Sequence, residues 1–147
     1  MTSKRLERLV RLKKLVERQK AADLVAEERR LSDATAQAEA TQAEIDAVDE
    51  GTGTQDVSAE DMLAANRWRG HLARKLQKDQ GAVVEQAAQV SNVRTDVQEA
   101  WRERRLMEGM KDRAVTAEAE EAAVGERKEY EAIALSVYSR RSKTEER

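Results

Sequence analysis

The chain has 147 residues, of which 38% are charged, and its formal net charge is −2. It contains no cysteine, proline or phenylalanine, and only 3% of its residues are aromatic. Because large apolar residues are few and widely spaced, this composition argues against a compact globular core and favours a coiled coil or long helix. The lack of cysteine also excludes disulfides and thiolate metal sites.

A first helix is predicted over about residues 3–49, with Thr2 or Ser3 able to cap its first turn. Its apolar stripe is broad near the start and regular from Leu24 onward. The stripe comprises Leu6, Leu9, Leu12, Leu15, Val16, Gln19, Ala22, Leu24, Leu31, Ala34, Ala38, Thr41, Ile45 and Val48. Several of these side chains are small and bury little area each, which predicts helix pairing of modest stability.

The loop signal lies at about residues 50–57, where Gly51 and Gly53 stand among polar residues. Ser58 follows as a predicted N-cap, with Glu60 and Asp61 at the positive end of the next helix dipole. A short loop between two long helices predicts an antiparallel hairpin.

The second helix is predicted over about residues 58–139, followed by a frayed tail at 140–147. Sixteen positions at alternating three- and four-residue spacing define its predicted packing face, and eleven of them are apolar. These positions are Met62, Ala65, Arg69, Leu72, Leu76, Asp79, Val83, Gln86, Val90, Val93, Val97, Ala100, Arg104, Met107, Lys111 and Ala114. The 3.5-residue period predicts a left-handed supercoil, and a rise of about 1.5 Å per residue predicts a helix of roughly 120 Å. We therefore predict an all-α fold, a single antiparallel coiled coil over residues 1–147 whose second helix is the longer.

If Val48 lies opposite Ala59, the two antiparallel helices pair in a register that places Leu6 near Trp101. Residues 107–138 then have no partner within the chain. They retain apolar residues off the heptad positions, namely Val115, Ala119, Ala122, Ala123, Ile133, Leu135, Val137 and Tyr138. Because an isolated helix is marginally stable, this segment either frays, pairs with a second chain or is held by a partner.

Charge is distributed unevenly. Residues 1–20 carry eight Lys or Arg and two Glu, whereas residues 31–66 carry nine acidic residues and no Lys or Arg. The basic end includes Lys4, Arg5, Arg8, Arg11, Lys13 and Lys14. It suits an acidic protein surface or a plain solvated face better than nucleic acid, because no aromatic residues are interleaved with the charges. A basic amphipathic helix lying on a membrane is a further alternative.

No catalytic constellation is present in the sequence. His71 is the sole histidine, and a surface histidine explains it better than a Ser-His or Cys-His centre. We therefore predict a protein that is not an enzyme and has no cofactor or metal. Trp68 and Trp101 each lie next to a packing position, where a tryptophan either covers the edge of the helix interface or anchors a partner.

At these tryptophans the sequence resembles the FliJ family of flagellar type III export proteins, over nearly the whole chain. The resemblance rests on three runs in this order: Asn66-Arg67-Trp68, Trp101-Arg102-Glu103-Arg104-Arg105 and Glu126-Arg127-Lys128-Glu129-Tyr130-Glu131. It implies an antiparallel coiled coil similar to the central stalk of rotary ATP synthases. Family members are non-enzymatic, enter the pore of the export ATPase ring, promote its assembly, contact the membrane export gate and engage export chaperones. The YscO-type injectisome stalk proteins are related in architecture.

The family's gate contacts use aromatic and large apolar side chains on the outer faces near the loop, and this chain has none there. It offers instead Ala40, Glu44, Ala47, Gly51, Arg74, Lys78, Gly81 and Glu85. The candidate partner-binding residues are Lys4, Arg5, Arg8, Arg11, Lys13, Lys14, Trp68, Trp101, Arg102 and Arg105.

No apolar run is long enough for a signal-peptide core or a membrane span. We therefore expect a cytoplasmic protein. The hairpin predicts a monomer when isolated, and the resemblance implies peripheral association with the inner membrane at the export apparatus. The alternative is a generic coiled-coil scaffold or dimerisation protein.

Overall fold

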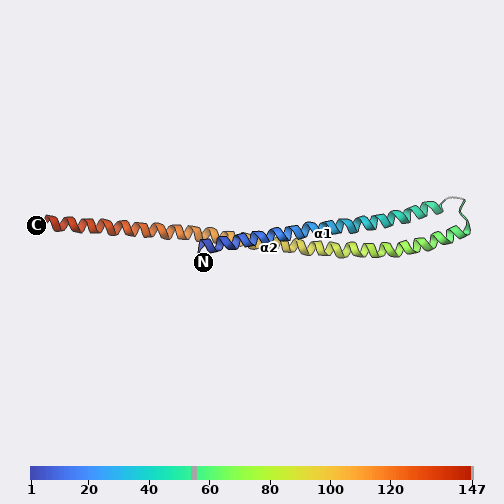
Figure 1. Cartoon of the computed structure of the whole chain (residues 1–147), viewed down its shortest axis with the longest axis horizontal. Helices are drawn as coiled ribbons and strands as arrows, with labels where there is room; N and C mark the ends of the chain where they lie inside the picture. The colour runs from blue at the N-terminus through green and yellow to red at the C-terminus, as the bar shows by residue number, and fades with distance from the viewer. Residues whose placement is uncertain (54–55, 147) are drawn as a thin grey trace. The chain divides into compact units, whose positions relative to one another are not determined.

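The computed structural model describes residues 1–53 and 56–146. It consists of two helices, α1 (Ser3–Thr52) and α2 (Ala59–Glu145), and the described residues form no strand. The helices pack against each other and α2 is the longer (Figure 1). The prediction of an all-α fold built from two packed helices is therefore confirmed. Part of the predicted loop, residues 54–55, lies outside the described residues.

Both helices extend further than the sequence predicted. α1 ends at Thr52 and not near Asp49, and α2 continues to Glu145 and not to Ser139. The predicted frayed tail is thus helical as far as Glu145, because residues 126–145 contain neither proline nor glycine to interrupt the backbone hydrogen bonds.

Both helices begin close to where the sequence predicted, and the predicted cap of α2 is present. The backbone carbonyl of Thr2 accepts the N–H of Leu6 at 3.1 Å, so α1 starts where predicted. The Ser58 hydroxyl accepts the N–H of Asp61 at 3.2 Å, which confirms Ser58 as the N-cap of α2.

The chain divides into two units, each containing part of both helices. Residues 16–100 form one, called here the hairpin unit, and residues 1–15 with 101–147 form the other, called the terminal unit.

The hairpin unit packs along the predicted face of α2. Every predicted packing position from Leu72 to Ala100 is buried or half-buried, and Leu72, Val90, Val93 and Ala100 are fully buried. The facing residues of α1 from Leu24 onward are buried or half-buried in the same way, namely Leu24, Leu31, Ala34, Ala38, Thr41, Ile45 and Val48. The heptad pattern was therefore predicted correctly from Leu24 in α1 and from Leu72 in α2, whereas the predicted packing positions Met62 and Arg69 are exposed.

The predicted register is wrong by about three helical turns. Asp49 was expected to face the beginning of α2, but it forms an ion pair with Arg69 at 3.0 Å. Val48 shares a hollow with Ala65 and Trp68, not with Ala59. The prediction paired the ends of the two helices, whereas residues 59–64 of α2 are all exposed and Ala65 is the first half-buried residue of that helix.

The terminal unit shows the same shift. Ser3 contacts Glu118, and Lys13 contacts Glu103, so Leu6 does not lie opposite Trp101. α1 therefore covers α2 beyond residue 107, and Met107, Lys111 and Ala114 are half-buried. From residue 115 to residue 146 every described side chain is exposed; we call this segment the C-terminal extension.

The predicted stripe at the start of α1 is correct at Leu6 and Leu9. It is wrong from Leu12 onward, because Leu12, Leu15 and Val16 are 57%, 58% and 45% exposed. The face that packs instead continues the alternating four- and three-residue spacing of the hairpin unit back to the N-terminus. Its members are Leu6, Val10, Lys13, Glu17, Lys20, Leu24 and Glu27, all buried or half-buried. Charged side chains occupy four of these positions. A prediction based on apolar residues alone therefore selected residues outside the packing face.

Candidate partner-binding surfaces

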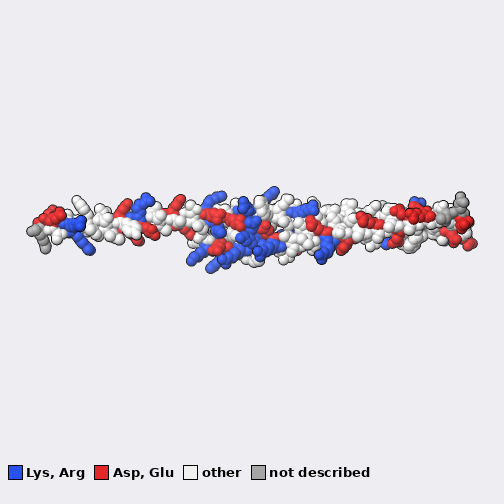
Figure 2. Space-filling model, turned by 90° about the horizontal axis from the view of Figure 1, so that it is seen from above, with Lys and Arg blue, Asp and Glu red and all other residues white. Residues whose placement is uncertain are grey.

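The first turns of α1 present a basic face to solvent. Lys4, Arg8 and Arg11 each lie two residues before a packing residue of α1, about 200° around the helix, and so they point away from α2. Figure 2 shows Lys and Arg side chains gathered around this end of α1. Within the described residues the side chains of Lys4, Arg5 and Arg8 form no ion pair, whereas Arg11 pairs with Glu7 of its own helix at 2.9 Å.

Lys13 and Lys14 differ from the rest of the predicted basic set, because both reach across to α2. The Lys13 Nζ lies 2.7 Å from the Glu103 carboxylate, and the Lys14 Nζ lies 3.8 Å from Glu108. These two lysines therefore take part in holding the helices together, and the residues available to a partner are those that precede them.

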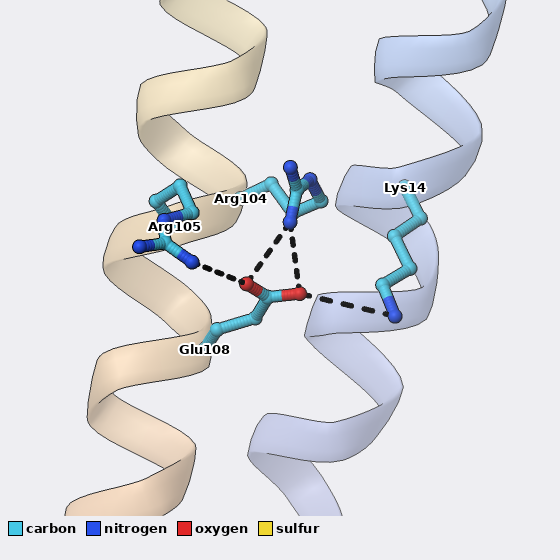
Figure 3. Close-up of polar contacts among 4 residues, drawn as sticks. All are labelled: Lys14, Arg104, Arg105 and Glu108. Atoms are coloured by element: carbon cyan, nitrogen blue, oxygen red, sulfur yellow. Dashed lines mark hydrogen bonds and ion pairs between the residues drawn. The ribbon is translucent and has the colours of Figure 1, made fainter.

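Glu108 is the centre of a charged cluster inside the terminal unit (Figure 3). Arg104 donates to both of its carboxylate oxygens at 2.9 Å, and Arg105 and Lys14 lie within 3.9 Å. The hydrogen bonds from Arg104 hold the pKa of Glu108 below its ordinary value of 4.5, against the opposing effect of burial. The positive charges of Arg104, Lys14 and Arg105 lower this pKa further. The cluster brings three basic residues, including the predicted site residues Lys14 and Arg105, onto one carboxylate.

Glu118 holds the N-terminus of α1 on α2. The Ser3 backbone N–H donates to one carboxylate oxygen of Glu118 at 2.7 Å, and the Ser3 hydroxyl donates to the other at 2.5 Å. A carboxylate at this place also meets the positive end of the α1 dipole. The Ser3 hydrogen bonds, then the charges of the N-terminal amino group and Lys4, lower the pKa of Glu118.

The two tryptophans are half-exposed, 50% for Trp68 and 48% for Trp101, and each has a partner on its own helix. The ring of Trp68 stacks on His71 with centroids 5.3 Å apart. The Arg105 guanidinium carbon lies 5.8 Å from the Trp101 ring centroid, a cation–π distance. Each ring thus has one neighbour on its own helix, and about half of each side chain stays open to solvent. Arg102 beside Trp101 is exposed as well.

The outer faces of the hairpin unit near its loop carry the residues predicted for them. Ala40, Glu44, Ala47 and Gly51 of α1 are all exposed. Arg74, Lys78, Gly81 and Glu85 of α2 are exposed in the same way. In Figure 2 the end of the hairpin unit next to the loop is rich in acidic side chains. This surface is charged and lacks aromatic residues at those eight positions.

The sequence missed Glu108 and Glu118, which fix the position of the first turns of α1. Extending the regular spacing of the hairpin unit backward from Leu24 would have placed Lys13 on the packing face and indicated an acidic partner on α2. No helix among residues 1–53 and 56–146 is long and apolar enough to cross a membrane.

Two long packed helices with charged outer faces define a coiled-coil protein. A family model described as the flagellar FliJ protein matches residues 2–143, and the chain therefore belongs to the FliJ family. The family is a non-catalytic part of flagellar protein export, so the chain has a role related to that process. Searches of the curated proteins and of the solved structures gave no match.

Proposed function

We propose that this chain is a non-enzymatic stalk of the flagellar type III export apparatus, and that its terminal unit enters the export ATPase ring and promotes ring assembly. The observation that carries the proposal is the exposed basic face at Lys4, Arg5 and Arg8, whose side chains form no ion pair within the described residues. It lies in the same unit as the C-terminal extension, which presents a second uncovered surface.

Ion pairs formed by this basic face would suit a stalk that rotates within the ATPase ring. An exposed ion pair contributes about 0–1 kcal/mol, and salt screens it over a Debye length of about 8–10 Å. Several weak contacts of this kind to acidic residues lining a pore hold the stalk without fixing one rotational position. Lys13 and Lys14 contribute indirectly, because their pairs with Glu103 and Glu108 hold α1 on α2.

Membership of the FliJ family supports two further partners, the membrane export gate and the chaperones that escort flagellar substrates. It also supports a cytoplasmic location at the inner membrane next to the export apparatus. The exposed tryptophans, Trp68 and Trp101, and the nearby Arg102 are the residues we assign to chaperone or gate contacts. The charged surface near the loop favours a polar gate contact over the aromatic one of other family members.

The test compares two charge-reversed variants of the full chain. Lys4→Glu with Arg8→Glu reverses the basic face, and Arg18→Glu with Arg29→Glu makes the same charge change at other exposed positions of α1. We expect the first variant to bind the purified export ATPase about tenfold more weakly at low salt, which corresponds to about 1.4 kcal/mol. The control variant should bind like the wild type, and circular dichroism should show equal helicity in all three proteins. Equal loss of binding in both variants would mean that net charge, not this face, sets the affinity.

A further inference from the structure

The C-terminal extension carries an apolar face that α1 does not cover. Its positions are spaced by four, three, four, four, three and four residues, and six of the seven are apolar. They are Val115, Ala119, Ala122, Glu126, Tyr130, Ile133 and Val137, all exposed. This face begins one residue after Ala114, the last half-buried packing position, and so lies about 100° around α2 from the face that meets α1.

The spacing reads the same in both directions from Glu126. If a second helix of the same sequence lies antiparallel with Glu126 at the twofold axis, every position of the face meets another position of the face. Val115 then lies opposite Val137 of the second copy, Ala119 opposite Ile133, and Ala122 opposite Tyr130. A twofold interface of this kind is self-complementary and closed.

The sizes of the side chains favour the antiparallel orientation. The first half of the face carries Ala119 and Ala122, and the second half carries Tyr130 and Ile133, so antiparallel pairing places a large residue against a small one. The layers then have similar volumes, as close packing requires. A parallel pair would place alanine against alanine and tyrosine against tyrosine, which leaves a gap in one layer and crowding in the next.

Charges agree with the same alignment. Glu126 meets its own copy at the axis, but Arg127 of the second copy is displaced by only one residue, about 1.5 Å along the axis, and can neutralise it. Arg140 lies opposite Asp112. We propose that this face binds a second copy of the chain, antiparallel, with Glu126 at the twofold axis.

The interface is small, and so the dimer should be weak. An aromatic side chain buries about 150–250 Å², whereas stable interfaces bury about 1,200–2,000 Å² in total. Only Tyr130 is aromatic among the seven positions, and the paired Glu126 side chains oppose association. The free chain is therefore a monomer when dilute and a dimer when concentrated, and the C-terminal extension is released when a larger partner takes its place.

Glu126 gives the sharpest test, because it is the one charged residue on the face. Glu126→Leu in the full chain should lower the dimer dissociation constant at least tenfold in sedimentation equilibrium. Glu131→Leu is the matched control, since it removes the same charge five residues on, about 140° around the helix. Its dissociation constant should equal that of the wild type. Equal constants for the two variants, or a wild type and Glu126→Leu that are both monomeric at about 1 mM, would overturn the proposal.

Cysteine crosslinking tests the orientation, because the natural chain has no cysteine. Glu126→Cys should form a disulfide with its own copy under mild oxidation, and a mixture of Val115→Cys and Val137→Cys should form the mixed disulfide. Val115→Cys alone should remain a thiol. Crosslinking of Val115→Cys with itself, without the mixed product, would show parallel pairing and reject the proposal. Neither experiment involves the ATPase, so its outcome is independent of the proposed stalk function.

Discussion

The hairpin unit and the terminal unit use one continuous heptad spacing but hold their helices together differently. In the hairpin unit the packed face consists mainly of apolar residues such as Ile45, Leu72, Val90 and Val93. In the terminal unit Leu6 and Val10 of α1 are fully buried, but no described residue of α2 is. Ion pairs between the helices occur in both units, for example Asp49 with Arg69 in the hairpin unit and Lys13 with Glu103 in the terminal unit. The two units therefore differ in how much apolar surface they bury, and polar contacts carry a larger share of the helix pairing in the terminal unit.

The two kinds of contact respond to different conditions. Burial of apolar surface is insensitive to moderate salt and to pH, whereas exposed ion pairs weaken as salt or protons neutralise their charges. The start of α1 should therefore detach from α2 under conditions that leave the hairpin unit folded. This matters for the proposed function, because the terminal unit is the part assigned to the ATPase ring.

The largest effect is expected at Leu72, which is only 1% exposed in the hairpin unit. Leu72→Ala leaves a cavity between the helices and should lower the free energy of unfolding by about 2–5 kcal/mol, measured by urea denaturation. Val84→Ala is the control on the same helix, because Val84 is 70% exposed and its truncation should change the free energy by less than about 0.5 kcal/mol. Similar losses in both variants would contradict the burial described for this unit.

A smaller effect is expected at Thr41, the fully buried polar residue of α1. Its hydroxyl donates to the Asp79 carboxylate at 2.7 Å and lies 3.1 Å from the Gln37 carbonyl. Thr41→Val keeps the shape but removes the donor, so unfolding should become easier by about 1–2 kcal/mol. Thr95→Val is the matched control, because that exposed hydroxyl donates to a carbonyl of its own helix and to no residue of α1. An unchanged free energy of unfolding in Thr41→Val would show that the hydrogen bond to Asp79 makes no net contribution to stability.

Acid should loosen the terminal unit before the hairpin unit. Because the pKa of Glu118 is lowered in the folded state, its contact stabilises the structure fully above the ordinary value of 4.5 and is lost as the pH falls through the folded value. Glu108 follows the same direction, since its folded pKa is also lowered. Hydrogen exchange at the first turns of α1 should therefore accelerate below about pH 4.5 relative to the intrinsic rate at each pH.

Glu118→Gln isolates this effect. At pH 7 the variant should exchange faster than the wild type near Ser3, and below the folded pKa the two proteins should exchange alike, because the wild-type carboxyl is then neutral too. Protection of Leu72 should be the same in both proteins at pH 7. A difference between the proteins that persists at low pH would mean that the shape of the side chain, not its charge, matters.

The sequence predicted the two helices, the cap at Ser58 and the packing face of α2 from Leu72 onward, because apolar periodicity is a local and regular signal. It did not predict the register, because residues 59–64 of α2 are exposed and the heptad repeat does not show where along that helix packing begins. The prediction misplaced the start of α1 because it chose the large apolar residues Leu12 and Leu15 as packing positions, whereas Lys13 lies on the packing face. Lys4, Arg5 and Arg8 are exposed as predicted, but their assignment to a partner stays a prediction.

The smallest effects are expected from glycine-to-alanine substitutions in α2, which compare the part that α1 covers with the part that it does not. Gly81 and Gly125 are both helical, and an added methyl group would meet no atom within 4 Å at either position. Alanine has the higher helix propensity by about 0.8–1.0 kcal/mol, so each substitution favours the helix locally. Gly81 lies in the hairpin unit, and there the gain should appear in the free energy of unfolding. Gly125 lies in the C-terminal extension, and there alanine should raise helicity in dilute solution without moving the urea midpoint.

The contrast depends on how far cooperativity extends along α2. An equal rise in the midpoint for Gly125→Ala and Gly81→Ala would show that the extension unfolds together with the hairpin unit. A change in helicity alone would show that a helix without a packed neighbour forms and melts independently, as expected for a segment whose described side chains are all exposed.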